Sequence, residues 1–450
     1  MGQHMGKWFK WLFAAIGIAL LLLVLVWGVS KLVGPSRAER ASLAVMSEPV
    51  QFTGRNAYPA IWLLDHPVPQ DQMEAVMAED VRRFKQSPLP DDNTASADFT
   101  TSAAQRYPSD RPAYEVRQRL CSAREDCLAK VRADLPGYEK LLEEHGAWIA
   151  RAEQATHADH LRNPFPARFD MPLPTFVSTY APATLFAVRF AQGQREAAIA
   201  STCQAITDWR KLGAHDDMLI SWAVARSFST EGYGGLLAQM LAEVPNGQPL
   251  PSACTEAMAV PAAAEISMCT TMRGEFAFMS QSMASIIDAE SHKRGLQQKI
   301  FSDGDMTKAM MAVPMAKYCA PATDAAFAAD KATPMTPSPG LYRLQCVANA
   351  VGCILSDVAA PGYQGFDLGH RDGLAMKRTL AGLAWWRSQP DAAKDPDAML
   401  ARLPAEFRSA AHPLKLNPEK TALVMPTLNG NKEDIVLPLP GSRAQPAPAK

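Results

Sequence analysis

The residues best placed for chemistry lie at 365–373 (GFDLGHRDG), where two acids, a histidine and an arginine stand between glycines. We expect this segment to be a loop. His370 beside the carboxylate of Asp367 could transfer a proton as a general acid or base. Alternatively, the loop caps a helix and holds an ion pair. We favour this structural interpretation, and the sequence leaves open whether the loop has any chemical role.

Two further groups of histidines could bind a ligand. His157 and His160 are three residues apart and could share a metal ion if a third ligand came from elsewhere. No third ligand lies nearby in the sequence, so we favour a polar helix end near the C-terminal dipole. After His215, Asp216 or Asp217 is better explained as the N-cap of the next helix than as a catalytic group. We therefore predict no catalytic, cofactor-binding or metal-binding residue.

Recognised catalytic motifs are missing from the sequence. It contains no G-x-S-x-G elbow, Walker A loop, H-E-x-x-H helix or EF-hand loop. The glycines at 232–235 follow a predicted helix instead of a strand, which does not fit a dinucleotide site. With 45 basic and 46 acidic residues and no basic stripe, the chain gives no reason to expect nucleic-acid binding.

An apolar run near the N-terminus indicates where the protein resides. Twenty uncharged residues, 11–30, follow Lys10. As a helix they would extend about 30 Å, enough to cross the core of a bilayer. We predict a cytoplasmic start at 1–10 and a retained transmembrane helix at 11–33. Cleavage as a signal peptide after Ser30 is the alternative.

All eight cysteines follow the apolar run. An even number on one side suits an oxidising compartment, and we favour disulfides over buried thiols. We therefore expect a single-pass protein of the bacterial inner membrane with its C-terminal domain in the periplasm.

Spacing bears on two cysteine pairs. Cys121 and Cys127 are the best local pair, because an S-x-x-E capping box starting at Ser122 places Cys121 beside the first turns of a helix. Cys346 and Cys353 should not pair if both lie in one continuous helix, expected over 339–358. Seven residues of helix rise about 10.5 Å, which is beyond the reach of a disulfide.

The pattern of apolar residues predicts a mostly α-helical protein with a small C-terminal β-hairpin. Among its helices are three expected at about 69–86, 137–153 and 306–315. Its large domain would consist of helical hairpins, arranged as a solenoid or a bundle. The expected divisions after the membrane helix are a stalk at 34–54, an N-terminal helical region at 55–162, a central helical domain at 163–389, a C-terminal linker and β-hairpin at 390–440, and a disordered tail at 441–450.

Two predicted helices meet at Gly193. In residues 185–206, small Ala191 and Ala198 flank the turn, and 196–199 (EAAI) opens the second helix. This segment resembles a tetratricopeptide hairpin. A second copy at the repeat interval of about 34 residues is missing, so a generic helical hairpin is the alternative to a solenoid.

Two apolar stretches, 421–425 and 434–439, flank an Asn-Gly turn signal and predict the hairpin, with Leu423 and Ile435 facing inward. Together with the Leu-Pro step at 403–404 and the segment 412–414 (HPL), this tail resembles that of uncharacterised single-span bacterial envelope proteins. The resemblance implies no activity.

Within a helix expected at 262–289, Arg273 and Glu275 could form a buried clamp or an exposed pair. Methionines gather on the same helix and could be core or an adaptable binding surface. They are Met268, Met272, Met279 and Met283.

Together these features predict a membrane-anchored periplasmic protein-binding domain without a cofactor. One version is an immunity protein that neutralises a secreted toxin. An envelope-assembly adaptor or chaperone fits equally well, and the rival class is an unrecognised periplasmic hydrolase around His370. The expected partners are a toxin or envelope component at the periplasmic face and the inner membrane through 11–33, not nucleic acid.

Overall fold

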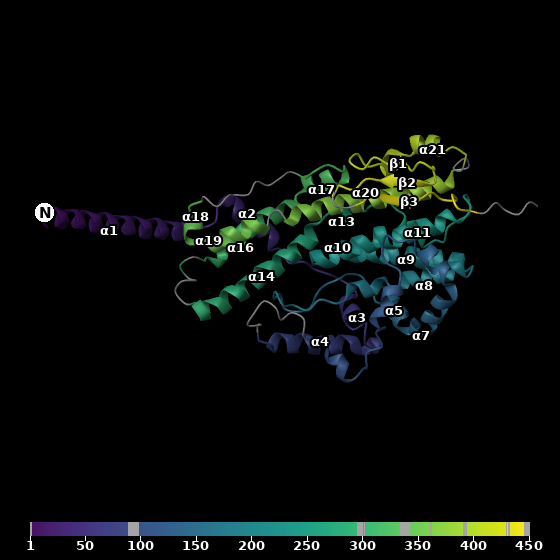
Figure 1. Cartoon of the computed structure of the whole chain (residues 1–450), viewed down its shortest axis with the longest axis horizontal. Coiled ribbons are helices and arrows are strands. Elements are labelled where there is room, and N and C mark those ends of the chain that lie inside the picture. The colour runs from purple at the N-terminus through teal and green to yellow at the C-terminus, as the bar shows by residue number, and fades with distance from the viewer. Residues whose placement is uncertain are drawn as a thin grey trace, which may run out of the picture. The chain divides into compact units, whose positions relative to one another are not determined.

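Helices make up most of the chain, and a small antiparallel sheet lies near the C-terminus (Figure 1). The predicted fold class is therefore confirmed. The computed structural model describes residues 2–88, 99–294, 300, 302–333, 343–359, 362–389, 394–428, 430 and 433–444. The predicted Asn-Gly turn and the last six residues of the predicted tail lie wholly or partly outside these ranges.

Two compact units divide the chain, and each is built from segments that are not consecutive in sequence. Unit 1 holds Met1–Glu48, Phe276–Lys317 and Met335–Gln364, whereas unit 2 holds Pro49–Glu275, Tyr318–Pro334 and Gly365–Lys450. Three helices contribute residues to both units: α14 (Cys269–Arg294), η5 (Lys317–Cys319) and α20 (Gly362–Ser388). The consecutive domain boundaries expected from the sequence stay predictions.

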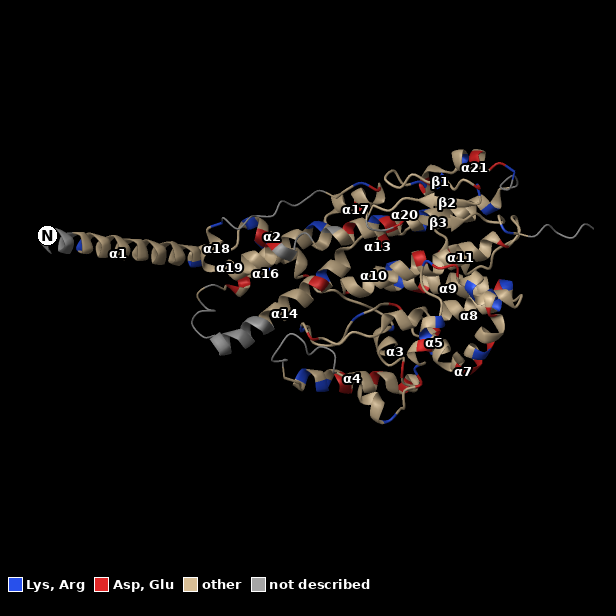
Figure 2. Cartoon of the chain, in the orientation of Figure 1, with Lys and Arg blue, Asp and Glu red and all other residues tan. Residues whose placement is uncertain are grey.

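Unit 1 begins with α1 (Gly2–Leu32). The stretch Trp8–Leu32 is long and apolar enough to cross a membrane, and none of its most apolar window is buried in the protein. No Asp, Glu, Lys or Arg lies between Lys10 and Lys31, and the ribbon of α1 is accordingly tan over most of its length in Figure 2. A retained anchor and a signal sequence both fit this helix.

The other helices of unit 1 are α2 (Arg37–Met46), α16 (Gly304–Ala316), α18 (Gln345–Ala348) and α19 (Ala350–Ala359). Helix α16 packs against α2 and α19, and Met306 and Met310 form a core with Cys346 and Cys353.

Helix α2 lies within the segment 34–54 that the sequence predicts as a stalk. Ser36 accepts the Glu39 N–H, and the Glu39 carboxylate accepts the Ser36 N–H at 2.7 Å, so a capping box starts a helix just after Pro35.

Cys346 and Cys353 are joined by a disulfide, with Cα atoms 5.7 Å apart. The prediction of one continuous helix over 339–358 is wrong in the described part of that range. Asn349 (φ −136°) interrupts the helix and separates α18 from α19. The buried Asn349 amide oxygen accepts the Asp303 N–H at 2.9 Å and the Thr307 hydroxyl at 3.1 Å. These bonds hold the bend that brings the two cysteines together.

Unit 2 is built around α9 (Arg195–Ala214), which packs against α8 (Pro182–Ala191), α10 (Leu219–Ser227) and α11 (Tyr233–Ala242). Helices α8 and α9 form the predicted helical hairpin, and Gly193 between them has a φ of +89°, which favours glycine.

The structure describes further helices in unit 2. They are α3 (Tyr58–Trp62), α4 (Gln70–Gln86), η2 (Ser102–Gln105), α5 (Tyr114–Arg119), α6 (Cys127–Ala133), α7 (Leu135–Gln154), η3 (Phe176–Tyr180), η4 (Phe228–Gly232), α12 (Cys254–Ala257), α13 (Ala263–Ile266), α17 (Pro321–Ala328), α21 (Pro396–Arg402) and η6 (Ala405–Phe407).

Strands β1 (Lys415–Leu416), β2 (Ala422–Met425) and β3 (Ile435–Pro438) form an antiparallel sheet in that order. Strands β2 and β3 confirm the predicted hairpin, and β1 adds a third strand. Leu423 faces inward opposite the buried Leu437, but Ile435 is only half-buried.

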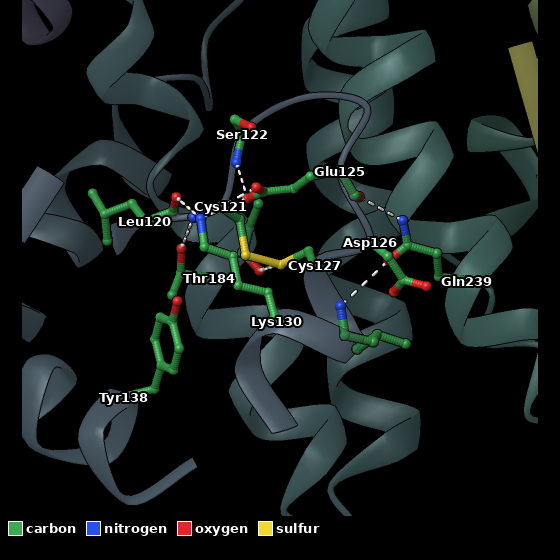
Figure 3. Close-up of a disulfide and its surroundings, with 12 residues drawn as sticks. Leu120, Cys121, Ser122, Glu125, Asp126, Cys127, Lys130, Tyr138, Thr184 and Gln239 are labelled. Carbon is green, nitrogen blue, oxygen red and sulfur yellow. Dashed lines mark hydrogen bonds and ion pairs between the residues drawn. A yellow bond between two sulfur atoms is a disulfide. The ribbon is translucent and has the colours of Figure 1, made fainter. Parts of the chain in front are cut away.

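Three disulfides join residues of unit 2: Cys121–Cys127, Cys203–Cys254 and Cys269–Cys319. The predicted pairing of Cys121 with Cys127 is confirmed. In Figure 3 the loop that this disulfide closes is tied to its neighbours. The Cys121 N–H donates to the Thr184 hydroxyl at 2.8 Å, and Lys130 Nζ donates to the Leu120 carbonyl at 2.9 Å.

The helix beside this disulfide starts later than the sequence predicts. Helix α6 begins at Cys127, where the Asp126 carboxylate accepts the Ala129 N–H at 3.1 Å. Of the expected capping box, only the bond from the Ser122 N–H to the Glu125 carboxylate forms, inside the disulfide loop.

Candidate functional site

The segment 365–373 is not a loop, because it lies within α20. Its glycines serve close packing. A Cβ atom on Gly373 would lie 2.8 Å from the side chain of Arg226, and one on Gly369 would lie 3.4 Å from the same guanidinium. Glycines four residues apart share one face of a helix, so they leave room for Arg226 from α10.

His370 faces the interior of unit 2 from α20. Its Nε2 donates to the Ile266 carbonyl at 2.8 Å, and its ring packs against those of Trp222 and Phe327. Burial lowers the pKa of His370 to about 3. The imidazole is therefore neutral near pH 7 and is a weak base, which does not match the pKa of an efficient general base.

The other charged residues of the segment bind separate partners. Asp367 accepts the Thr333 hydroxyl, and Arg371 donates to the Asp330 carboxylate at 3.2 Å and to the Asp330 carbonyl at 2.8 Å. The side chains of 365–373 therefore contact different neighbours, and they link separate elements of unit 2.

The strongest ionic cluster in this region centres on His412, which the sequence analysis did not nominate. Its Nδ1 lies 2.7 Å from the Asp330 carboxylate and its Nε2 lies 2.9 Å from that of Asp372. All three side chains are at most 2% exposed. Burial alone would lower the pKa of His412, but the bonds to the two acids outweigh it and raise the pKa. The cluster therefore holds α20, the end of α17 and the chain before β1 together.

Replacing His412 by glutamine should lower the free energy of unfolding by about 3 kcal/mol at pH 6, because two buried carboxylates lose their cation. The folded-state pKa of His412 lies above its unfolded value of about 6.5. Its contribution is therefore fully present below about pH 6.5 and is lost as the pH rises through the folded-state pKa. Urea denaturation of both proteins at several pH values between 6 and 9 measures this. A difference in stability that stays constant across that range would contradict the ion-pair assignment.

A second buried cluster joins α9, α13 and α20. Glu265 accepts two bonds from the Arg210 guanidinium, at 2.9 and 2.8 Å, and one from Lys377 Nζ at 2.7 Å. All three side chains are at most 10% exposed. Burial would raise the pKa of Glu265, but Lys377 and Arg210 lower it to about 2. One carboxylate thus holds two buried cations.

Beside this cluster lies a small cavity of about 20 Å³, lined in part by Trp209, Trp222, Arg226 and His370. Within the described ranges, Nε and Nη1 of Arg226 and Nε1 of Trp209 are buried without a hydrogen-bond partner. The cavity has room for about one water molecule. It is too small for an organic substrate, although its lining is rich in donors.

His157 and His160 do not share a ligand. His157 Nδ1 lies 2.5 Å from the Asp208 carboxylate, which raises the pKa of His157. The His160 ring stacks on Phe52 with ring centres 4.9 Å apart. Among the residues that the structure describes, no group of three or more His, Cys, Asp or Glu side chains could hold a metal ion.

Asp216 and Asp217 lie just before α10. The predicted N-cap is wrong, because Met218 occupies that position of α10 and makes no side-chain cap. The buried Asp216 carboxylate instead accepts the Met218 N–H at 2.8 Å and the Ser221 hydroxyl at 2.7 Å, which holds the turn before the helix. Asp217 accepts the Asn163 N–H at 3.3 Å, and burial raises the pKa of Asp217 to about 7.

The four methionines of the predicted helix, Met268 just before α14 and three on α14, differ in burial. Met268 and Met272 are fully buried, whereas Met279 and Met283 are half-buried. On the same helix, Glu275 accepts the Leu219 N–H at 3.3 Å, and burial raises the pKa of Glu275. Two of the four methionines, Met268 and Met272, therefore belong to the core of unit 2.

An open candidate site is a groove of about 480 Å³ between α3, α4 and α7 of unit 2. Its floor is mostly apolar and its rim carries polar side chains. The floor residues are Pro59, Ala60, Leu63, Leu64, Met73, Ala155 and Ala158, and the rim residues are Arg55, Asn56, Gln70, Glu74, Arg151, Gln154 and His157. The sequence predicted α4 and α7 but gave no signal that they border a groove, because the lining residues come from three helices and the segments beside them, far apart in the sequence.

The fold and these sites define a disulfide-bonded helical protein with one N-terminal helix that could span a membrane. No family model, curated protein or solved structure matches the chain.

Proposed function

We propose that this protein is anchored in a membrane by α1 and that its groove between α3, α4 and α7 binds a polypeptide segment of a partner protein. The groove is the observation that carries the proposal. Its volume of about 480 Å³ lies within the range of about 300–1,000 Å³ typical of ligand sites.

The make-up of the groove favours a polypeptide. Buried Leu63 and Leu64 offer an apolar floor for one or two side chains of the partner. At the rim, Gln70 and Gln154 are exposed and carry both amide donors and carbonyl acceptors. An extended peptide presents both kinds of group, apolar side chains and backbone amides.

The proposed location is the periplasmic face of a bacterial inner membrane. The four disulfides support an oxidising compartment, and α1 supports attachment to the membrane. The partner would be a secreted toxin, which would make the protein an immunity protein, or a component of the envelope, which would make it an adaptor or chaperone.

Photocrosslinking in cells tests the groove. A benzophenone amino acid replaces Gln154 at the rim or, as a control on the same helix, the exposed Lys140 outside the groove. We expect a protein adduct from position 154 alone. Ala60→Trp, which fills the floor, should abolish the adduct, whereas Ala78→Trp on the exposed face of α4 should leave it intact.

The adduct also identifies the kind of partner. A toxin that the purified full-length protein inhibits would establish the immunity role, and an envelope component would establish the adaptor role. Equal adducts from positions 154 and 140, or no protein adduct from position 154, would overturn the proposed groove.

A further inference from the structure

Helices α18 and α19 carry a stripe of large apolar side chains that no part of the protein covers within the described residues. Leu344, Val347, Val351 and Ile354 are 42%, 40%, 39% and 51% exposed. Leu344, immediately before α18, and Val347 are three residues apart, as are Val351 and Ile354 in α19, so each pair lies on one side of its own helix, before and after the bend at Asn349. We call these four residues the apolar stripe. The cysteines at 346 and 353 point the other way, into the core of unit 1.

The apolar stripe begins at the C-terminal end of α1. The Ser30 hydroxyl donates to the Leu344 carbonyl at 2.6 Å and accepts the Ala348 N–H at 3.0 Å, so α18 is bonded to the last turn of α1. Ser30 is buried by this contact, whereas Leu32 is 86% exposed. Figure 1 shows α18 beside this end of α1, which agrees with the contacts between the two helices.

The length of α1 sets the depth of this contact. The 25 residues of Trp8–Leu32 extend about 37 Å, somewhat more than the roughly 30 Å of a bilayer core. The last turn therefore lies near the boundary between acyl chains and headgroups. Trp27 and Lys31 at this end are residue types that favour that boundary, and both donate to backbone carbonyls of unit 1, at Ile300 and Ser302.

Two features keep the stripe in place. The Cys346–Cys353 disulfide closes the bend between α18 and α19, and Asn349 at the bend is bonded to the start of α16. The exposed apolar side chains are therefore held on a fixed surface next to the end of α1.

We infer that α18 and α19 lie in the membrane interface, with the apolar stripe inserted into the leaflet in which α1 ends. The occupant of the stripe is lipid, because the stripe continues the apolar surface of α1 at the depth where acyl chains begin. This inference rests on the membrane anchoring by α1 in the proposed function.

Site-specific fluorescence tests the inference in the full-length protein. All eight cysteines are in disulfides, so a single added cysteine can be labelled with the environment-sensitive fluorophore NBD. Val351→Cys reports on the stripe, Leu22→Cys on the middle of α1, and Lys140→Cys, at a side chain 76% exposed in unit 2, serves as the solvent control. Each protein is reconstituted into phosphatidylcholine vesicles that contain a doxyl-labelled lipid, or is exposed to iodide in water.

We expect the doxyl lipid to quench labels at positions 22 and 351 at least twofold more than the label at position 140, and iodide to show the opposite order. If position 22 responds to lipid but position 351 responds to iodide, the stripe is solvent-exposed and the inference is wrong while the anchor stands. If position 22 responds to iodide, the anchor itself is wrong. Protection of position 351 from both quenchers, together with a disulfide-linked dimer of the unlabelled Val351→Cys variant, would show that a second copy covers the stripe and would also overturn the inference.

Discussion

Replacing Glu265 by glutamine is expected to lower the free energy of unfolding by about 3–5 kcal/mol, because Arg210 and Lys377 would remain buried without their carboxylate. Urea denaturation of the full-length protein in detergent measures the change. Glu144→Gln is the matched control, since its partner Lys140 is 3.8 Å away and both side chains are exposed. We expect that control to change stability by less than about 0.5 kcal/mol.

Two further measurements separate lost charge pairing from general damage. Adding Lys377→Met to Glu265→Gln should recover part of the loss, because it removes one of the two unpaired cations. The pKa of Glu265 is lowered to about 2, so its contribution is present above about pH 4.5 and is lost as the pH falls through about 2. A loss below about 1 kcal/mol at pH 7 would contradict the assigned role of Glu265.

Removing the Cys203–Cys254 disulfide by two alanine substitutions is expected to destabilise the protein by about 4 kcal/mol, compared with about 2.5 kcal/mol for Cys121–Cys127. The sequence separations are 51 and 6 residues, and a longer closed loop restricts the unfolded chain more. Denaturation without reductant measures both variants, and the unaltered protein should show no reactive thiol when it is denatured unreduced. Equal losses, or a larger loss for the short loop, would contradict the chain-entropy explanation.

Local signals in the sequence predicted much of the fold. Periodic apolar residues placed α4, α7 and α16, and the glycine at 193 marked the turn between α8 and α9. Turn chemistry and alternation predicted β2 and β3. In each of these elements, the residues that determine the conformation lie within a few positions of one another.

The predictions from sequence that failed concern segments whose conformation depends on contacts with residues far away in the sequence. Glycines at 369 and 373 suggested a loop, but they lie in α20 because Arg226 packs against them from α10. Asn349 breaks a predicted helix through bonds to residues more than 40 positions earlier. The missed His412 cluster joins residues 82 and 40 positions apart, and no local pattern could have indicated it.

The bond between Ser30 and Leu344 spans 314 residues and has a consequence for biosynthesis. At a translation rate of about 5–20 residues per second, the ribosome needs roughly 15–60 s to make the chain between them. During that time α1 would already be in the bilayer while the segment that packs against it does not yet exist. The nascent protein therefore passes through a stage in which the end of α1 lacks its native neighbours, and in which binding by a chaperone or digestion by a protease would compete with folding.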